Sequence, residues 1–233
     1  MKITWFGHSC FRVETGESRI LIDPFLTGNA TFEDAGIPVR EVAKGITHLV
    51  LTHGHDDHTG DTVSILKESD ATLVAVFELA AHLQSKGVEK AEYANTGGTL
   101  NFGDFSVTYV PAFHSSSTIV DGKPLYLGAA CGVIITPKAG KTIYHMGDTD
   151  IFSDMGLINE MHQPKIGFVP IGDRFTMGAK SAALACKRFF DFETVVPCHY
   201  GTFPIIDQTA DKFMAEMGGN RVRVPEVGVP FEA

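Results

Sequence analysis

Short apolar runs alternate along the chain with amphipathic stretches and glycine-rich turns. In the first part of the chain, apolar runs bounded by turn residues predict strands over residues 2–6, 10–14, 19–23, 46–51 and 72–76. A helix is expected over residues 77–86, where Gly87 closes it. The segment 24–45 is punctuated by glycine and proline, so we expect a flexible loop over one edge of the fold.

The second part of the chain continues the same pattern. It predicts strands at roughly 91–94, 105–110, 129–136, 142–145, 166–170 and 194–197, and helices over 179–190 and 207–217. Each predicted helix places apolar residues on one face, as a core-facing helix does. Strands followed by helices in both halves fit an α/β sandwich in which two sheets lie between helices. We find no repeat or linker, so residues 1–233 are expected to form one domain.

Composition and charge narrow the function classes. The 233 residues are 44% hydrophobic and 20% charged, which is an ordinary globular composition with enough apolar content for a core. The formal net charge of −9 argues against a general nucleic-acid binder. No apolar run approaches the roughly 18 residues of a membrane helix, and polar residues come too early for a secretory leader. The expected location is therefore the cytoplasm.

The cysteines do not indicate a site, whereas the histidines do. Four cysteines lie far apart without a C-x-x-C pair, which argues against a zinc ribbon and implies no disulfide framework. Of ten histidines, three fall between residues 53 and 58, in Thr-His-Gly-His-Asp-Asp-His. This stretch follows the apolar strand 46–51 and precedes a helix for which Thr59 is the expected N-cap. Imidazole and carboxylate at this density suit zinc, manganese or iron, and they are too dense for an ordinary polar turn.

The pattern His-x-His-x-Asp-His over residues 53–58 resembles the signature of the metallo-β-lactamase fold. The resemblance extends over nearly the whole chain, through Asp23, His114, Asp148 and His199 in their own short motifs. It implies a four-layer αβ/βα sandwich. It also implies a bridging role for Asp148, and identifies His114 and His199 as later histidine ligands.

The resemblance and the ligand chemistry together imply two metal sites. One set would be His53, His55 and His114, the other would be Asp57, His58 and His199, and Asp148 would bridge them. Two divalent transition metal ions, zinc foremost with manganese, iron or nickel as alternatives, would share a water. They would lower its pKa toward ~7, so that a bridging hydroxide is the nucleophile.

Five further roles are expected around these ligands. Asp57 is expected to accept protons as well as bind metal, and Asp23 to accept a hydrogen bond from a ligand imidazole. His8 is expected to project into the mouth of the site, where it would stabilise an oxyanion or protonate a leaving group, with a structural histidine as the alternative. Arg174 would bind a substrate phosphate or carboxylate, or else be a solvated loop residue. Tyr200 would either contact substrate or pack.

Three other stretches resemble a narrower group of small, stand-alone bacterial and archaeal hydrolases related to the L-ascorbate 6-phosphate lactonases. These stretches are residues 7–11, 175–178 and 199–204. Relatives of this kind often form homo-oligomers, which the resemblance implies here. The loop 115–127 is expected to be a flap on the substrate side, with Lys123 and Tyr126 as contacts.

The leading interpretation is a binuclear metal-dependent hydrolase that cleaves an ester, lactone or phosphodiester bond of a small anionic substrate. One alternative is a non-enzymatic metal-binding or sensor protein that retains the site. The other is a phosphodiesterase or nuclease, although the negative charge and the lack of a basic arm disfavour a tRNA-processing enzyme. The complete ligand set favours catalysis.

Overall fold

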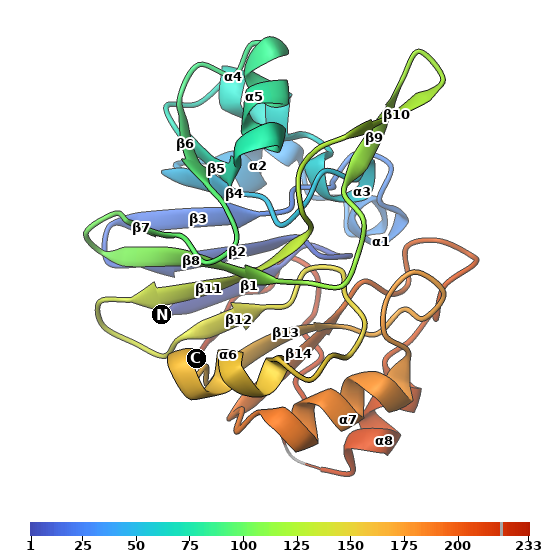
Figure 1. Ribbon diagram of the computed structural model, residues 1–233. Helices are drawn as coiled ribbons and strands as arrows, with labels where there is room; N and C mark the ends of the chain where they lie inside the picture. Colours follow the sequence, from blue (N-terminus) through green and yellow to red (C-terminus); the bar gives the residue numbers. More distant parts are fainter. Residues whose placement is uncertain (220) are drawn as a thin grey trace.

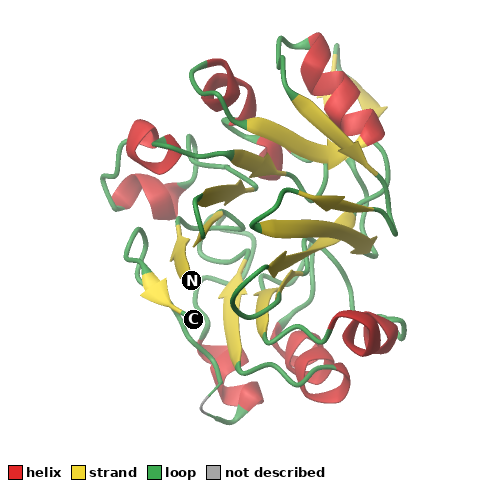
Figure 2. Ribbon diagram, turned by 90° about the vertical axis from the view of Figure 1, so that its left-hand side faces the viewer, coloured by secondary structure: helices red, strands yellow, loops and turns green. Residues whose placement is uncertain are grey.

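Two β-sheets face each other in the computed structural model, and helices cover their outer sides (Figure 1; Figure 2). The structure describes residues 1–219 and 221–233. The layers run helix, sheet, sheet, helix, which is the four-layer αβ/βα sandwich that the sequence predicts. None of the helices in the described ranges has the length and apolarity needed to cross a membrane.

The first sheet has seven strands, in the order β15-β1-β2-β3-β4-β5-β6. They span Phe231–Glu232 (β15), Lys2–Trp5 (β1), Phe11–Thr15 (β2), Ser18–Ile22 (β3), His48–Val50 (β4), Thr72–Val76 (β5) and Ala91–Ala94 (β6). The strands β3 to β6 are parallel, and the others pair antiparallel. The helices of this half are Ala30–Asp34 (α1), Val39–Ala43 (α2), Asp56–Thr59 (α3), Thr62–Lys67 (α4) and Phe77–Ser85 (α5).

The second sheet has six strands, in the order β14-β13-β12-β11-β8-β7. They span Thr194–Cys198 (β14), Ile166–Pro170 (β13), Ile143–His145 (β12), Cys131–Pro137 (β11), Phe105–Pro111 (β8) and Thr99–Asn101 (β7). Its helices are Met155–His162 (α6), Ala179–Phe189 (α7) and Asp211–Met217 (α8). The strands β9 (Ser117–Val120) and β10 (Lys123–Tyr126) form a separate hairpin that projects from the body of the molecule (Figure 1).

The core lies between the sheets, where the buried apolar side chains form one cluster. Phe11 of the first sheet stacks on Phe168 of the second, with ring centroids 3.9 Å apart. Tyr109 of β8 donates its hydroxyl to the carbonyl oxygens of Leu51 and Val74, at 3.1 and 2.8 Å. Aromatic stacking and a bifurcated hydrogen bond therefore join the two sheets.

The main strands and the helices near 77–86 and 179–190 are confirmed, but several predictions are wrong. The segment 24–45 contains α1 and α2 instead of a flexible loop. In α1, the Asn29 side chain caps the helix by accepting a hydrogen bond from Phe32 N. Only Phe32 of this helix is buried, so the sequence shows no apolar periodicity that would predict the helix. Thr59 ends α3 and is not an N-cap, because Asp61 precedes α4.

Other differences involve short or exposed elements. The helix expected over 207–217 begins only at Asp211, and the flap 115–127 contains the β9–β10 hairpin. The strands β7 and β15 and helix α6 have no counterpart in the prediction. β7 and β15 have three and two residues, which is too short for a period-2 pattern to be visible.

The strand ends position the site. Asp23, the 52–58 loop, His114, Asp148 and His199 all follow the carboxyl end of a strand, namely β3, β4, β8, β12 and β14. β3 and β4 are parallel, as are β12, β13 and β14, so each group ends at one edge of its sheet. The two edges face each other, which is where sites gather in α/β folds.

The hydroxyl of Tyr109 provides a test of how the sheets are joined. Changing Tyr109→Phe leaves two buried carbonyl oxygens without this donor, so we expect a loss of about 1–3 kcal/mol in the free energy of unfolding. Tyr144→Phe is the matched control, because the buried Tyr144 hydroxyl has no hydrogen-bond partner among the residues that the structure describes. Urea unfolding of the metal-free proteins measures both, and equal stabilities for the two variants would contradict this reading.

Candidate metal centre

The seven ligands predicted from the sequence come together between the facing sheet edges. Three clusters bring their nitrogen and oxygen atoms within 4.8 Å of one another. The clusters are His8 with Asp57, His58 and His199; His53 with His55 and His114; and His53 with His58 and Asp148. Because the clusters share members, they form one continuous centre.

The first set of three imidazoles converges on a single point. His53 Nε2 lies 3.0 Å from His55 Nδ1, and His114 Nε2 lies 3.3 Å from the same atom. His53 is fully buried, whereas His55 and His114 are partly exposed. Burial lowers the pKa of His53 well below its usual value and also lowers the pKa of His55 and His114. Neutral imidazoles are the form that binds metal.

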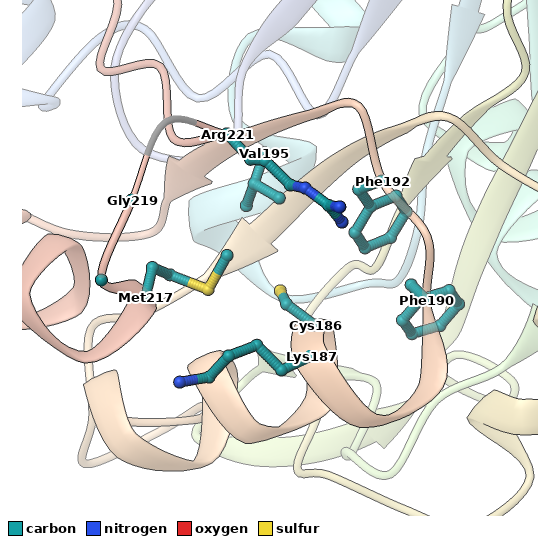
Figure 3. Close-up of a pocket in the computed structure, with 9 residues that line it drawn as sticks. Cys186, Lys187, Phe190, Phe192, Val195, Met217, Gly219 and Arg221 are labelled. Carbon is teal, nitrogen blue, oxygen red and sulfur yellow. The ribbon is translucent and has the colours of Figure 1, made fainter.

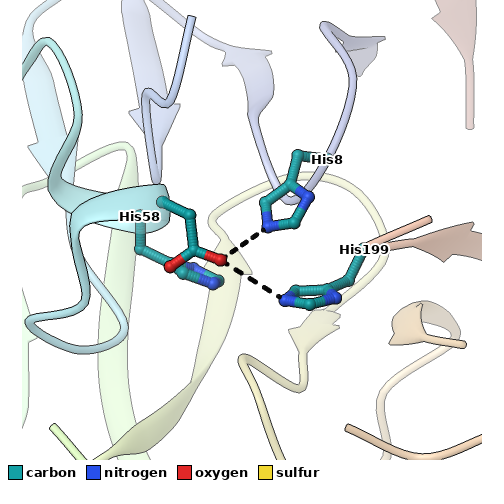
Figure 4. Close-up of side chains that lie close together, drawn as sticks. His8, His58 and His199 are labelled. Carbon is teal, nitrogen blue, oxygen red and sulfur yellow. Dashed lines mark hydrogen bonds and ion pairs between the residues drawn. The ribbon is translucent and has the colours of Figure 1, made fainter. Parts of the chain in front are cut away.

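The second set contains Asp57, His58 and His199, and Asp148 adjoins it. Asp57 Oδ2 lies 3.7 Å from His199 Nε2 (Figure 4). Asp148 Oδ2 lies 3.0 Å from the same nitrogen. Asp148 Oδ1 lies 3.2 Å from His58 Nε2. Burial opposes ionisation of both carboxylates, but the neighbouring histidines outweigh it and lower the pKa of Asp57 and of Asp148.

Asp148 reaches both sets. Its Oδ2 lies 3.5 Å from His114 Nε2 and 4.0 Å from His53 Nε2, in addition to the contact with His199. Its Oδ1 faces His58. The side chain is only 2% exposed, so the carboxylate is held between the sets. This is the position that a bridging ligand needs.

The pattern of unsatisfied atoms tests whether a metal fits. Buried polar atoms without a hydrogen-bond partner include His58 Nε2, Asp148 Oδ1 and both ring nitrogens of His199. Buried polar groups ordinarily find such partners, and a cluster of exceptions needs an explanation. The Nε2 atoms of His58 and His199 lie 3.2 and 3.0 Å from oxygens of Asp148 without hydrogen-bond geometry. The two atoms of each pair are therefore suited to bind the same cation. The residues present therefore fit divalent metal.

Asp23 sets the orientation of two imidazoles. His58 Nδ1 lies 2.7 Å from Asp23 Oδ2, and the Thr52 hydroxyl donates to the same oxygen at 2.7 Å. Since the Thr52 proton is committed to Asp23, Thr52 Oγ1 accepts from His53 Nδ1 at 3.0 Å. Both rings then present Nε2 to the centre. Asp23 is fully buried, so its carboxylate fixes the tautomers through one direct and one relayed contact.

The carboxylates also determine the charge of two ligands in the metal-free protein. Burial lowers the pKa of His58, but Asp148 and Asp23 outweigh it and raise the pKa well above 6.5. For His199, burial is again the largest effect, and Asp148 and Asp57 reverse it to raise the pKa to about 9. Both rings are therefore in the doubly protonated, positively charged form at neutral pH, until a metal displaces one proton from each.

His8 is buried and does not reach the mouth of the site, contrary to the sequence-based expectation. Its Nε2 lies 3.1 Å from Asp57 Oδ2, and its Nδ1 lies 3.0 Å from Thr202 Oγ1. Figure 4 shows His8 and His199 directed at the same carboxylate oxygen. A ring nitrogen of His8 also belongs to the cluster of potential ligand atoms from Asp57, His58 and His199, a role that the sequence did not suggest.

The two predicted substrate contacts lie in different environments. Arg174 is exposed in the loop after β13, with its guanidinium 5.7 Å from the ring centroid of Phe175. Tyr200 is buried and stacks on Trp5 at 5.4 Å. Packing is therefore the role that the geometry gives Tyr200, and neither residue lines a cavity beside the metal cluster.

His145 and Cys198 lie near the centre but are engaged elsewhere. His145 Nε2 lies 3.0 Å from the carbonyl oxygen of Ser9, and Nδ1 accepts from Gly147 N at 3.0 Å. With both ring nitrogens occupied by the backbone, His145 is a structural residue. Cys198 is a buried core thiol, and burial raises its pKa well above its usual value.

Hydroxyl groups tie the β9–β10 hairpin to the metal-binding loop, a role that the sequence did not reveal. Ser115 Oγ lies 3.2 Å from His55 Nε2, Ser116 Oγ accepts from Gly54 N at 3.0 Å, and Thr118 donates to Asp56 at 2.6 Å. Runs of serine and threonine are common in loops, so only the three-dimensional arrangement distinguishes these tethers from solvated side chains.

Two cavities open on the centre, and Ser117 of the hairpin lines both. One of about 520 Å³ is lined by His55 and Asp57, and the other of about 490 Å³ by His114. A third, of about 470 Å³, lies between α7, α8 and β14 (Figure 3). Among the described residues, its lining holds one thiol and neither histidine nor carboxylate, so we place the candidate site at the first two.

Comparison with known proteins gives consistent results. Residues 2–199 match the profile of the Beta-lactamase superfamily domain. The chain is 59% identical over 224 residues to a protein of Rhizobium etli named UPF0173 metal-dependent hydrolase, covering 96% of this chain and 95% of the relative. A protein of the same name from Agrobacterium fabrum is also 59% identical, over 231 residues and 98% of each chain.

Solved structures agree with the fold described above. Igni18, a metallo hydrolase from Ignicoccus hospitalis, superimposes with a TM-score of 0.86 at 35% identity, over 100% of this chain and 98% of that one. An isothiocyanate hydrolase from Delia radicum gut bacteria superimposes with a TM-score of 0.79 at 22% identity, over 100% and 99%. At that identity the second match supports the fold alone.

The tautomer network predicts the effect of changing Asp23. Asp23→Asn removes the carboxylate that accepts from His58 and Thr52, so we expect metal affinity to fall roughly 10–100-fold with the fold retained. Asp104→Asn is the matched control, since Asp104 also accepts from a backbone N–H and a hydroxyl, but at the start of β8. Zinc titration against a competing chelator measures both, and an unchanged affinity for Asp23→Asn contradicts the network.

The raised pKa values of His58 and His199 predict a pH dependence of metal binding. In the metal-free protein His199 is protonated below about pH 9, and the raised pKa of His58 keeps that ring protonated at neutral pH. Each imidazolium must lose a proton to bind metal. Affinity therefore rises with pH between 6.5 and 8.5, by about tenfold per pH unit for each proton displaced. Zinc titration calorimetry in buffers of different ionisation enthalpy counts the released protons. A pH-independent affinity without proton release is the opposing result.

Proposed function

Because the chain belongs to the β-lactamase superfamily, we propose that it is a binuclear metal-dependent hydrolase that cleaves an ester, lactone or phosphodiester bond. Its relatives in Rhizobium and Agrobacterium are named metal-dependent hydrolases, which supports hydrolysis as the reaction class. The type of bond cleaved and the use of two ions go beyond what the names of these relatives state.

One observation supports the binuclear centre most strongly. Asp148 has an oxygen toward each of the two ligand sets, at 3.2 Å from His58 on one side and 3.5 Å from His114 on the other. A carboxylate has two oxygens with free lone pairs, so it can join two ions. Three imidazoles on one side, and Asp57, His58 and His199 on the other, then complete both sets. Imidazole and carboxylate suit zinc foremost, then manganese, iron or nickel.

When bound, the ions would supply a water nucleophile of lowered pKa and would polarise the oxygen of the scissile bond. The protein's own groups have complementary tasks. Asp57 is 27% exposed and lines the 520 Å³ cavity, so its carboxylate can accept a proton from water and return it to the leaving group. His8 holds Asp57 in place from the buried side, and Thr202 holds His8.

The role given to Asp23 is also one of orientation. Its contacts with His58 and Thr52 keep Nε2 of two ligand rings directed at the centre. Orientation of this kind keeps the ligands from rotating away when the site is empty of substrate. We assign Arg174 no part in this account, because it lines neither cavity at the centre.

The bridging ligand provides the test of the proposed function. Asp148→Asn removes one anionic oxygen and His114→Ala removes one imidazole, so each variant should lose at least 100-fold in kcat/KM for a hydrolysed ester or lactone. Circular dichroism should show both folded. His82→Ala changes a partly exposed histidine on α5 that belongs to none of the ligand clusters, so this control should keep full activity. Full activity in Asp148→Asn or His114→Ala would refute the proposed mechanism.

A further inference from the structure

We propose that the 520 Å³ cavity beside Asp57 binds a neutral, apolar group of the substrate, and that Ile119 of the hairpin determines this preference. The inference rests on the proposed function, because the occupant is the substrate whose scissile bond lies at the metal centre. The volume lies within the range of small-molecule sites. His55 and Asp57 belong both to the lining and to the ligand clusters, so the cavity continues directly from the centre.

Three apolar side chains from distant parts of the sequence form the cavity. Phe25 follows β3, Phe203 follows β14, and Ile119 lies in β9. The two phenylalanine rings stack with centroids 5.8 Å apart, and each meets the edge of His8 at 5.5 Å. Ile119 is 62% exposed, so its side chain is available to contact a group bound in the cavity. An apolar substrate group would cover it.

The charged side chains that line the cavity disfavour an anionic tail. Its lining includes the carboxylates of Asp56 and Asp57 but, within the described residues, neither lysine nor arginine. A carboxylate or phosphate in the part of the cavity away from the proposed metal ions would face the Asp56 carboxylate with no lysine or arginine to hold it. The cavity lined by His114 likewise has neither lysine nor arginine among its described residues. The anionic substrate expected from the sequence therefore stays a prediction.

The hairpin is fixed in a position where the Ile119 side chain can contact a group bound in the cavity. Thr118, its immediate neighbour, donates to Asp56 of α3 at 2.6 Å, and Ser115 contacts His55 at 3.2 Å. These two hydroxyl contacts fasten the start of β9, and the residues just before it, to the metal-binding loop. Ile119 is thus fixed beside the centre rather than carried on a free loop.

A matched series of p-nitrophenyl esters tests the proposal on the zinc-loaded enzyme. From acetate through butyrate to hexanoate, kcat/KM should rise by up to about fourfold per methylene, as expected for burial of CH₂ groups. The succinate monoester matches butyrate in chain length but ends in a carboxylate, and it should react at least tenfold less efficiently than butyrate. A flat chain-length profile, or a preference for the succinate ester, overturns the proposal.

Two lysine substitutions on the hairpin separate the cavity from general charge effects. Ile119→Lys places a cation in the lining, so it should lower the hexanoate-to-succinate ratio of kcat/KM at least tenfold. Leu125→Lys is the matched control, because Leu125 is exposed on the partner strand β10 but lines neither cavity. Equal changes in the two variants would show that hairpin charge, and not the cavity, controls specificity.

A binding measurement separates failure of this inference from failure of the proposed function. N-phenyl-1-naphthylamine is a neutral apolar probe whose fluorescence rises in apolar sites, and it needs no turnover. If every ester proves inert, the proposed ester hydrolysis fails, while probe binding that is weakened by Ile119→Lys and not by Leu125→Lys still supports the apolar subsite. Binding that is equal in wild type and both variants overturns the subsite even if the esters are hydrolysed.

Discussion

The geometry of the candidate metal centre depends on one fully buried carboxylate, Asp23, which contacts one ligand ring directly and a second ring through Thr52. It accepts from His58 and from Thr52, and Thr52 in turn accepts from His53. This chain of hydrogen bonds turns Nε2 of one ring in each ligand set toward Asp148. Without it, the imidazoles would be free to present either nitrogen, and the two sets would lose their common focus.

The fold supports this arrangement because it brings together the carboxyl ends of strands from the two sheets. β3 and β4 deliver Asp23 and the histidine-rich loop from the first sheet, and β12 and β14 deliver Asp148 and His199 from the second. Contacts such as Phe11 on Phe168 fix the distance between the sheets. Gly172 follows β13 and lets the loops pack tightly, because a Cβ there would collide with the His199 carbonyl. Core packing thereby sets the ligand geometry.

Sequence reasoning could find the candidate ligands that the structure brings together, because metal chemistry restricts residue types and because each candidate follows a strand. It could also find the central strands, whose apolar runs are continuous. It could not find α1, whose single buried residue gives no periodicity, or the buried position of His8, which depends on Asp57 and Thr202 from distant loops. The lack of lysine and arginine among the described residues that line the two cavities likewise depends on how loops meet. The relation to L-ascorbate 6-phosphate lactonases stays a prediction.

The most direct test of a centre with two ligand sets joined by Asp148 is the metal content of the protein. The protein should be purified without chelators and without a histidine tag, and its metals counted per chain by elemental analysis. The account predicts close to two equivalents of transition metal per chain. One equivalent would contradict the bridging role of Asp148, and none after reconstitution with zinc, manganese and iron would contradict the assignment of the ligands.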